Sequence, residues 1–349
     1  MARSAIRPPT LKDIAAEAGV SIVAASVALN PSARSRAKVG AATRRKVLRI
    51  AEKLHYKPNM FASALRQRGA GRIGFAADRF DDLANNELKH RVLRLGIQRK
   101  VAMTFLNFDA YSTAASMLRD MLSYDFDKLI LFRFWDRMNA GERAALAERF
   151  GERLLVLDVR SERDRARYGV SFLSMDFDLA WGQIFAHAAE AGYRRAAVLT
   201  YLLPPGLPGT KVFVSPQEER LKQLSRAHGA GFFDHRRDVF RADLGSPKAV
   251  YVATRALLER GVDFIKIHHD QIAPMVYRAV RDAGKRIPQE VGIAGFDDLY
   301  FAEYLDPPLT TVRNDFGAYA KSIFDWLEEP RPTVLIPHEL LVRGSTRRR

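Results

Sequence analysis

The segment from Thr10 to Asn30 most constrains the fold of this chain, because two short helical patterns in it are separated by a single glycine. Apolar residues form one face of the first pattern, at Leu11, Ile14, Ala15 and Ala18. Thr10 can cap that helix, Gly19 accepts the left-handed conformation that ends it, and Ser21 can cap a second helix. A third apolar stripe follows at Val47, Ile50, Ala51 and Leu54. The sequence therefore predicts three short helices around a small core, which is the arrangement of a helix-turn-helix DNA-binding module.

Positive charge is concentrated at the same end of the chain. Residues 1–72 contain fifteen Lys or Arg and three acids, a net charge of +12, whereas the whole chain carries +16. Because cationic side chains displace the counterions of DNA phosphates, a basic helical module indicates nucleic-acid binding rather than a merely solvated surface.

Size and composition limit what the rest of the chain can be. At 349 residues it exceeds one typical core, so we expect two or three domains. Cysteine is absent, which excludes disulfides, thiolate metal sites and cysteine nucleophiles and fits a reducing compartment. The sequence has neither a signal-peptide core nor an apolar run long enough to span a membrane, so we expect a cytoplasmic protein with no membrane partner.

Beyond residue 72, short β-like runs alternate with amphipathic helical stretches. The predicted strands are 73–77, 100–106, 128–132, 154–159, 196–201, 263–267 and 291–296. The predicted helices are 84–96, 112–124, 140–150, 177–191, 216–228, 246–260 and 270–283. This alternation predicts parallel sheets with helices on both faces, and its length exceeds one sheet. The expected fold is a small all-α head plus an α/β core of two doubly wound parallel-sheet subdomains, with a ligand cleft at the carboxyl ends of the strands.

Polar residues stand where several predicted strands end, at Asp78, Asp158, His268–Asp270 and Asp297–Asp298. Carboxylates there can accept hydrogen bonds from the hydroxyls of a small polar ligand. Metal binding by His268–Asp270 is disfavoured, because adjacent residues of a strand point to opposite faces of the sheet. The glycine pattern at 69–74 formally fits a nucleotide-binding motif, but it precedes a strand instead of following one. We expect no catalytic residue, no metal and no cofactor.

In this order and spacing, the segments resemble the lac/gal repressor family of bacterial transcription regulators over essentially the whole chain. The residues that carry the resemblance are Thr10–Ala15, Gly19–Ser21, Asn30, Thr43–Val47, Tyr56–Asn59, Leu65, Gly295–Asp298, Pro307–Val312 and Pro337–Ser345. The resemblance implies a nucleoid-associated protein of the bacterial cytoplasm without enzymatic activity. It also implies a core like periplasmic sugar-binding proteins and a homodimer on double-stranded operator DNA; no heptad extension follows residue 345, so a tetramer is less expected.

The resemblance assigns DNA contacts to the head and to the segment after it. Ser21 to Asn30 is then the recognition helix, and Asn59 to Leu65 is a hinge helix whose Leu65 wedges open a base step in the minor groove. The loop 31–38 is longer and more basic than usual, which favours phosphate contacts. The expected DNA-binding residues are Thr10, Ser21, Ile22, Val23, Ser26, Val27, Arg34, Arg36, Asn59, Ala62 and Leu65. Relatives usually carry a long polar residue at position 27 and polar or small residues at positions 22 and 23. The aliphatic side chains of this chain can only pack on groove surfaces such as thymine methyls.

The resemblance also assigns an effector site. The expected ligand-binding residues are Asp78, Asp158, Arg220, His269 and Asp297. A guanidinium fork with carboxylate acceptors suits a sugar-like or otherwise polar ligand. His269 replaces an Asn that is common in relatives, and the segment 202–215 is long and rich in Pro and Gly. Both an unusual ligand and a loss of ligand binding therefore stay open.

The expected domains are a DNA-binding head at 1–58, a hinge helix and linker at 59–71, and an effector and dimerisation core at 72–349. Within the core we expect one subdomain at 72–160 plus 313–330 and a second at 161–312 plus 331–349. The leading hypothesis is a repressor whose affinity for a pseudopalindromic operator is modulated by a small effector. Two alternatives stay open: a sugar-processing enzyme with an appended DNA-binding module, and a shape-reading DNA-binding protein without an effector.

Overall fold

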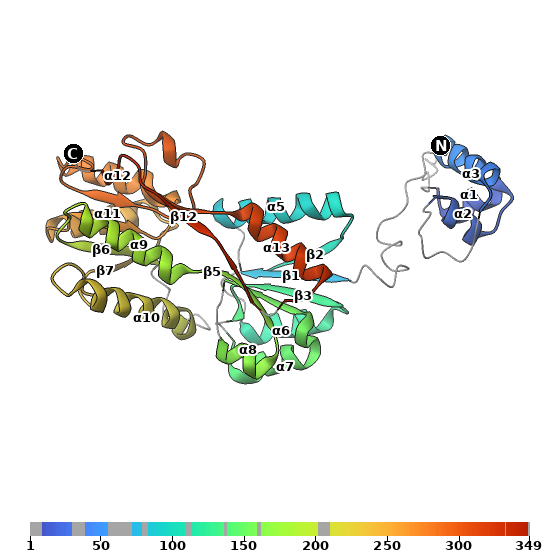
Figure 1. Ribbon diagram of the computed structural model, residues 1–349, viewed down its shortest axis with the longest axis horizontal. Coiled ribbons are helices and arrows are strands. Elements are labelled where there is room, and N and C mark those ends of the chain that lie inside the picture. Colours follow the sequence, from blue (N-terminus) through green and yellow to red (C-terminus); the bar gives the residue numbers. More distant parts are fainter. Residues whose placement is uncertain are drawn as a thin grey trace, which may run out of the picture. The chain divides into compact units, whose positions relative to one another are not determined.

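The computed structural model describes residues 9–29, 39–54, 72–78, 83–108, 113–135, 138–158, 162–201, 210–331 and 333–347. The chain forms two compact units, Met1–Ala70 and Gly71–Arg349 (Figure 1). Each unit has its own hydrophobic core. Among the described residues, no helix combines the length and the apolar character needed to cross a membrane.

The first unit is a bundle of three helices, α1 (Leu11–Ala18), α2 (Ile22–Leu29) and α3 (Ala41–Lys53). Gly19 ends α1 at φ 65°, and the Ser21 hydroxyl oxygen caps α2 by accepting from the Ala24 amide at 3.1 Å. Thr10 and Asp13 form a capping box at the start of α1, in which the Thr10 amide and hydroxyl donate to the Asp13 carboxylate at 2.7 and 2.6 Å. The buried core residues are Ile14, Ala15, Ala18, Ala25, Ala28, Val47, Ile50 and Ala51.

The second unit begins with a six-stranded sheet in the order β11-β5-β4-β3-β1-β2, in which every pair is parallel. Its strands are β1 (Ile73–Asp78), β2 (Met103–Phe108), β3 (Lys128–Phe132), β4 (Leu154–Leu157), β5 (Ser171–Met175) and β11 (Thr333–Ile336). One face is covered by α5 (Leu83–Arg99) and α13 (Phe316–Glu328). The other face is covered by α6 (Ala114–Ser123), α7 (Ala140–Phe150) and α8 (Glu162–Tyr168) (Figure 1). We call this part the N-subdomain.

The rest of this unit, the C-subdomain, has a parallel four-stranded sheet in the order β7-β6-β8-β9. Its strands are β6 (Ala196–Tyr201), β7 (Val239–Ala242), β8 (Phe264–Ile267) and β9 (Gly292–Ala294). The helices are α9 (Phe177–Glu190), α10 (Thr210–His228), α11 (Pro247–Glu259) and α12 (Ala273–Asp282). Short 3-10 turns lie at Gly151–Arg153, Asp270–Ile272 and Ala302–Tyr304. Helices α9 and α10 pack on one face of the sheet, and α11 and α12 pack on the other.

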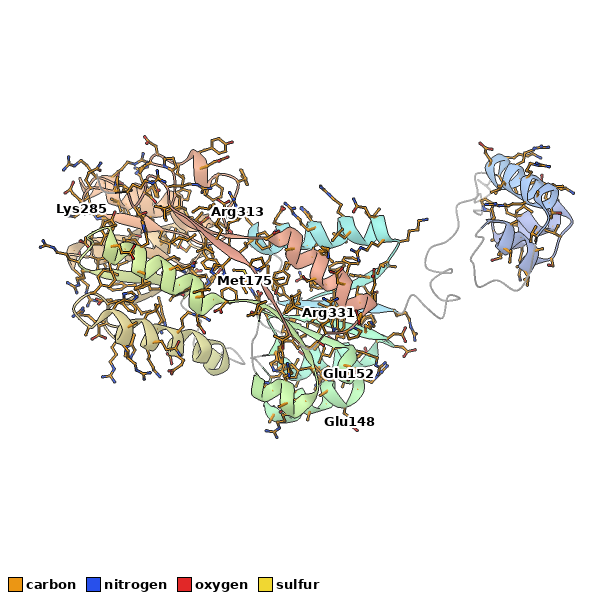
Figure 2. All side chains as sticks on the ribbon, viewed as in Figure 1. Glu148, Glu152, Met175, Lys285, Arg313 and Arg331 are labelled. Carbon is orange, nitrogen blue, oxygen red and sulfur yellow. The ribbon has the colours of Figure 1, made fainter. Side chains whose placement is uncertain are left out.

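Three connections join the two subdomains: β5 to α9, β10 (Thr311–Asn314) to α13, and β11 to β12 (His338–Leu341). Strands β10 and β12 pair antiparallel with each other. Met175, the last residue of β5, lies where the first connection begins (Figure 2). The other two connections begin at Asn314 and Ile336. The three crossings come from different parts of the sequence, and all of them connect the same two subdomains.

The predicted fold class is confirmed, since the chain has a three-helix head and two parallel α/β sheets. The subdomain limits after residues 160 and 330 were wrong. They assign β5 and β11 to the second subdomain, whereas these strands pair with each other and β5 pairs with β4 in the first. The sequence-based reading overlooked β5, β7, β10, β11, β12, α8 and α13. Strand β2 begins at Met103 rather than at Lys100, because Lys100 ends the preceding helix at φ 56°.

Candidate DNA-binding head and effector site

The second helix of the head presents an aliphatic surface. Ile22 and Val23 at its start are 42% and 64% exposed, whereas Ala25 and Ala28 are buried against the other helices. Ser21 is also exposed, and Ser26 and Val27 are partly exposed. Exposed aliphatic side chains on so small a bundle are available for contact with a partner.

Helix α3 supplies most of the positive charge of the described head. Its exposed cations are Arg44, Arg45, Lys46, Arg49 and Lys53. Lys53 pairs with Glu17 at 2.9 Å, and Arg44 Nε donates to the Ala28 carbonyl at 3.4 Å, which links α3 to the end of α2. The sequence-based site missed these side chains, although the charge count of residues 1–72 contained the signal.

Several expected contacts cannot be placed. Arg34, Arg36, Asn59, Ala62 and Leu65 lie outside the described residues. Asp78 ends strand β1 as expected, but its side chain also lies outside them.

In the N-subdomain, Asp158 follows β4 in the left-handed conformation, at φ 62°. Its Oδ1 accepts the hydroxyl of Tyr319 at 2.7 Å, and its Oδ2 lies 3.5 Å from Nε of Arg133. Burial and the charge of Asp158 raise the pKa of Tyr319 well above its usual value, so this phenol remains a neutral donor. The sequence-based reading found the carboxylate but missed both of its partners.

In the C-subdomain, Asp297 and Asp298 both have positive φ angles, 104° and 49°. Consecutive non-glycine residues in this region are strained, and such strain concentrates at functional sites. Asn314 Nδ2 donates to Asp297 Oδ1 at 2.7 Å. Asp298 accepts from Arg313 at 2.8 Å and from Arg343 at 2.7 Å. The first carboxylate is therefore held by a strand at a crossing between the subdomains, and the second is fixed by an ion-pair network.

Buried Asp270 holds the loop that carries these carboxylates. It accepts from the amides of Phe296 and Leu299 at 2.7 and 3.0 Å and from the Thr311 hydroxyl at 2.8 Å. A side chain at Gly295 would collide with its Oδ1, so only glycine fits there. Burial raises the pKa of Asp270 to about 7, against the opposing effect of these donors. Asp270 is therefore structural.

Two histidines follow β8 and are held by the end of the neighbouring strand β6. His268 Nδ1 lies 3.0 Å from the Thr200 hydroxyl oxygen, and His269 Nε2 lies 2.9 Å from that of Tyr201. Burial lowers the pKa of His268 well below its usual value, so it is neutral at pH 7. No group of three metal-ligating side chains occurs among the described residues.

Arg220 on α10 lies at the same end of the C-subdomain sheet. Its Nε is 2.5 Å from Asp178 Oδ1, and its guanidinium lies over the rings of Phe177 and Trp181 at 5.5 and 5.6 Å. Charges from both subdomains act on His268, since Arg133 and Arg220 both lower its pKa.

A cavity of about 790 Å³ lies beside this region, between α5 and the crossing strands. It is lined by Asp297, Asn314 and Phe316 and, from α5, by Leu83 and His90. A volume of this size accommodates a small molecule. Of the expected ligand residues, only Asp297 is among its described lining residues. The Leu83 amide donates to Gln271 Oε1 at 3.3 Å, a direct contact between the subdomains.

Comparison with known proteins gives two family matches. Residues 10–59 match the lacI family of bacterial regulatory proteins, and residues 185–346 match a periplasmic binding protein-like domain. The transcriptional regulator MalR of Streptomyces coelicolor is 27% identical over 96% of this chain and 96% of its own length.

Two solved structures share the fold. The lac repressor dimer bound to operator and the anti-inducer ONPF has a TM-score of 0.78 at 21% identity, over 97% of this chain and 99% of the other. A complex of the transcriptional regulator CelR with cellobiose has a TM-score of 0.58 at 21% identity, over 97% and 99%.

Proposed function

Since this chain belongs to the lacI family of bacterial regulatory proteins, and is a DNA-binding transcriptional regulator rather than an enzyme, we propose that it is a repressor controlled by a small sugar-like effector. The family excludes the alternative of a sugar-processing enzyme with an appended DNA-binding module. The observation that carries the proposal is the cavity of about 790 Å³ that is lined by residues of both subdomains, His90 of α5 and Asp297 and Asn314 beside the crossing strands.

The head would read DNA mainly by shape and apolar contact. In a homodimer, two copies of α2 would enter successive major grooves of a pseudopalindromic operator. Ser21 and Ser26 offer hydroxyls to bases or phosphates, while Ile22, Val23 and Val27 pack on thymine methyls. The cations of α3, with Arg34 and Arg36, would add phosphate contacts. Thr10, the N-cap of α1, would contact the DNA backbone, while Asn59, Ala62 and Leu65 would form the minor-groove hinge.

The effector would bind between the two subdomains, at the carboxyl ends of the strands. Asp158 and Asp297 would accept hydrogen bonds from ligand hydroxyls, and Arg220 would donate to them. His269 would add a polar contact next to Tyr201 at 2.9 Å, and Asp78 would complete the set from the end of β1. The cellobiose complex of CelR supports a carbohydrate of this kind.

Effector binding would change the angle between the N-subdomain and the C-subdomain, and this change would alter the affinity of the head for DNA. Closure around a ligand changes the three connections and contacts such as Leu83 to Gln271. The shift in operator affinity equals the difference in effector affinity between the two arrangements, so a ligand that binds both equally would have no effect.

The proposal is tested by selecting genomic fragments on the full-length chain and screening sugars for release of the selected fragment. We expect a fragment with dyad symmetry and at least one sugar that weakens its binding. Selected fragments without a common sequence would instead favour the alternative of a shape-reading DNA-binding protein. The observation that favours this alternative is the exposed aliphatic surface of α2. In that case binding would collapse uniformly with salt for all fragments.

A further inference from the structure

A lysine that the proposed function does not use is buried in the sheet of the C-subdomain. Lys266, the third residue of β8, is 0% exposed. Its Nζ lies 3.6 Å from the centroid of the Trp181 ring and 5.2 Å from that of Phe296. Its one hydrogen bond among the described residues goes to the carbonyl oxygen of His268, at 3.4 Å. Lysine is rarely buried so completely without a carboxylate partner.

The ammonium points towards the end of the strand where the effector site lies. The carbonyl that it contacts belongs to the first residue after β8, and the negative charge of Asp297 acts on it. Arg220 lies over the same Trp181 ring, at 5.6 Å. Two cations therefore share one aromatic cluster at this edge of the sheet.

The ammonium form of Lys266 is only partly stabilised by the groups around it. Burial and the nearby Arg220 lower its pKa well below the usual value, while Asp297 and Asp270 act in the opposite direction. Asp297 is also engaged by Asn314, and Asp270 by two amides and a hydroxyl. A further anion near the strand end would interact strongly with the ammonium, because the surrounding rings keep the dielectric constant low.

We propose that Lys266 makes this site selective for an anionic carbohydrate, a sugar that carries a carboxylate or a phosphate. The inference rests on the proposed effector function of the cleft. An anionic group at the strand ends offsets the cost of the buried ammonium and meets the guanidinium of Arg220, which suits carboxylates and phosphates. A neutral sugar gives no such compensation.

The test is titration calorimetry of the full-length chain with two matched ligand series. The ligands are glucose, glucuronate and glucose 6-phosphate, and galactose, galacturonate and galactose 6-phosphate. The variant is Lys266→Met, which keeps the length of the side chain and removes its charge; replacing a buried charge by an apolar group of similar volume preserves folding. The control is Lys248→Met, on the exposed surface of α11 in the same subdomain.

We expect at least one acid or phosphate to bind about tenfold more tightly than its neutral parent, which corresponds to about 1.4 kcal/mol. The preference should disappear in Lys266→Met and persist in Lys248→Met, and the acid and phosphate arms identify which anion is bound. A neutral parent that binds equally well, or a preference that survives in Lys266→Met, overturns the inference and leaves the effector function standing. Binding by none of the six ligands contradicts the sugar-effector function as well.

Discussion

The hydroxyl of Tyr319 donates to the carboxylate of Asp158 across 2.7 Å, although the two residues are 161 positions apart in the chain. Tyr319 lies on α13, which follows the second crossing between the subdomains, and Asp158 follows β4 in the N-subdomain sheet. The Asp158 amide also donates to the Tyr319 oxygen at 3.2 Å. This pair fixes a proposed ligand carboxylate to a helix that begins at a crossing.

Tyr319→Phe should therefore destabilise the core and weaken effector binding. Removing the hydroxyl leaves a partly buried carboxylate with one donor fewer, which costs roughly 1–3 kcal/mol. Urea denaturation measures the first effect and effector titration the second. Tyr168→Phe is a suitable control, because among the described residues the Tyr168 hydroxyl makes a single, 3.4 Å hydrogen bond, to the Ala140 carbonyl. Equal effector affinity in Tyr319→Phe and the wild type would contradict the role of this pair.

Arg220→Ala should strongly weaken the effector response while sparing operator binding. The guanidinium is half-enclosed by two aromatic rings and is the proposed donor to the ligand. Loss of a charged hydrogen bond should weaken effector binding by about tenfold to a hundredfold. Arg226→Ala on the same helix is the matched control, since that side chain is 73% exposed. Operator-release curves measured for both variants decide the point, and an unchanged response in Arg220→Ala would refute the assignment.

The raised pKa of Asp270 predicts a pH-dependent stability. Its pKa is about 7 in the folded chain against an ordinary value of 3.8, so its contribution is fully present below about pH 4 and is lost as the pH rises towards 7. The extra stability of the wild type over Asp270→Asn should therefore shrink between pH 4 and 7, by roughly 1.4 kcal/mol per pH unit.

Urea denaturation of the wild type and Asp270→Asn at pH 4, 5, 6 and 7 measures this difference. Comparing the two proteins at each pH cancels the other carboxylates, such as Asp238 and Asp282, whose pKa values are lowered. A difference that grows with pH would mean that the amide and hydroxyl donors outweigh burial and keep Asp270 ionised.

Leu65→Ala should weaken specific binding much more than non-specific binding. The proposed wedge opens one base step, whose unstacking is worth a few kcal/mol, so specific affinity should fall by roughly tenfold to a hundredfold. Fluorescence anisotropy with a selected operator and with a scrambled duplex at one salt concentration gives both affinities. An equal loss on the two duplexes would argue against a wedge.

The sequence predicted those elements whose pattern is strongly periodic. The three head helices and seven strands of the core were found because their apolar residues recur at helical spacing or form short unbroken runs. Strand β5 escaped because its sequence, Ser171–Met175, interrupts the apolar run with a second serine at Ser174, and its burial comes from segments distant in the sequence, on both faces and at both edges of the strand. Missing it placed the subdomain limit too early.

The candidate site was predictable only in part, for a similar reason. A carboxylate at a strand end, such as Asp158 or Asp297, is visible in the sequence. The partner of Asp158 is Tyr319, 161 residues away in the sequence, and the partner of Asp297 is Asn314, 17 residues away. Both partners lie at or after a crossing between the subdomains. Lys266 has apolar neighbours on both sides in the sequence, and its position between two aromatic rings depends on α9 and on the loop after β9. Local periodicity carries no information on such contacts.

In the proposed function, the basic head binds a specific DNA duplex and the core binds a metabolite that changes this affinity. Anisotropy of the full-length chain on a selected genomic fragment, with scrambled competitor at physiological salt and with each of the six sugars, tests it most directly. We expect tight binding to the selected fragment alone, at least about a thousandfold above the scrambled one, and release by one ligand. Equal affinity for both duplexes, or no change with any ligand, would contradict it.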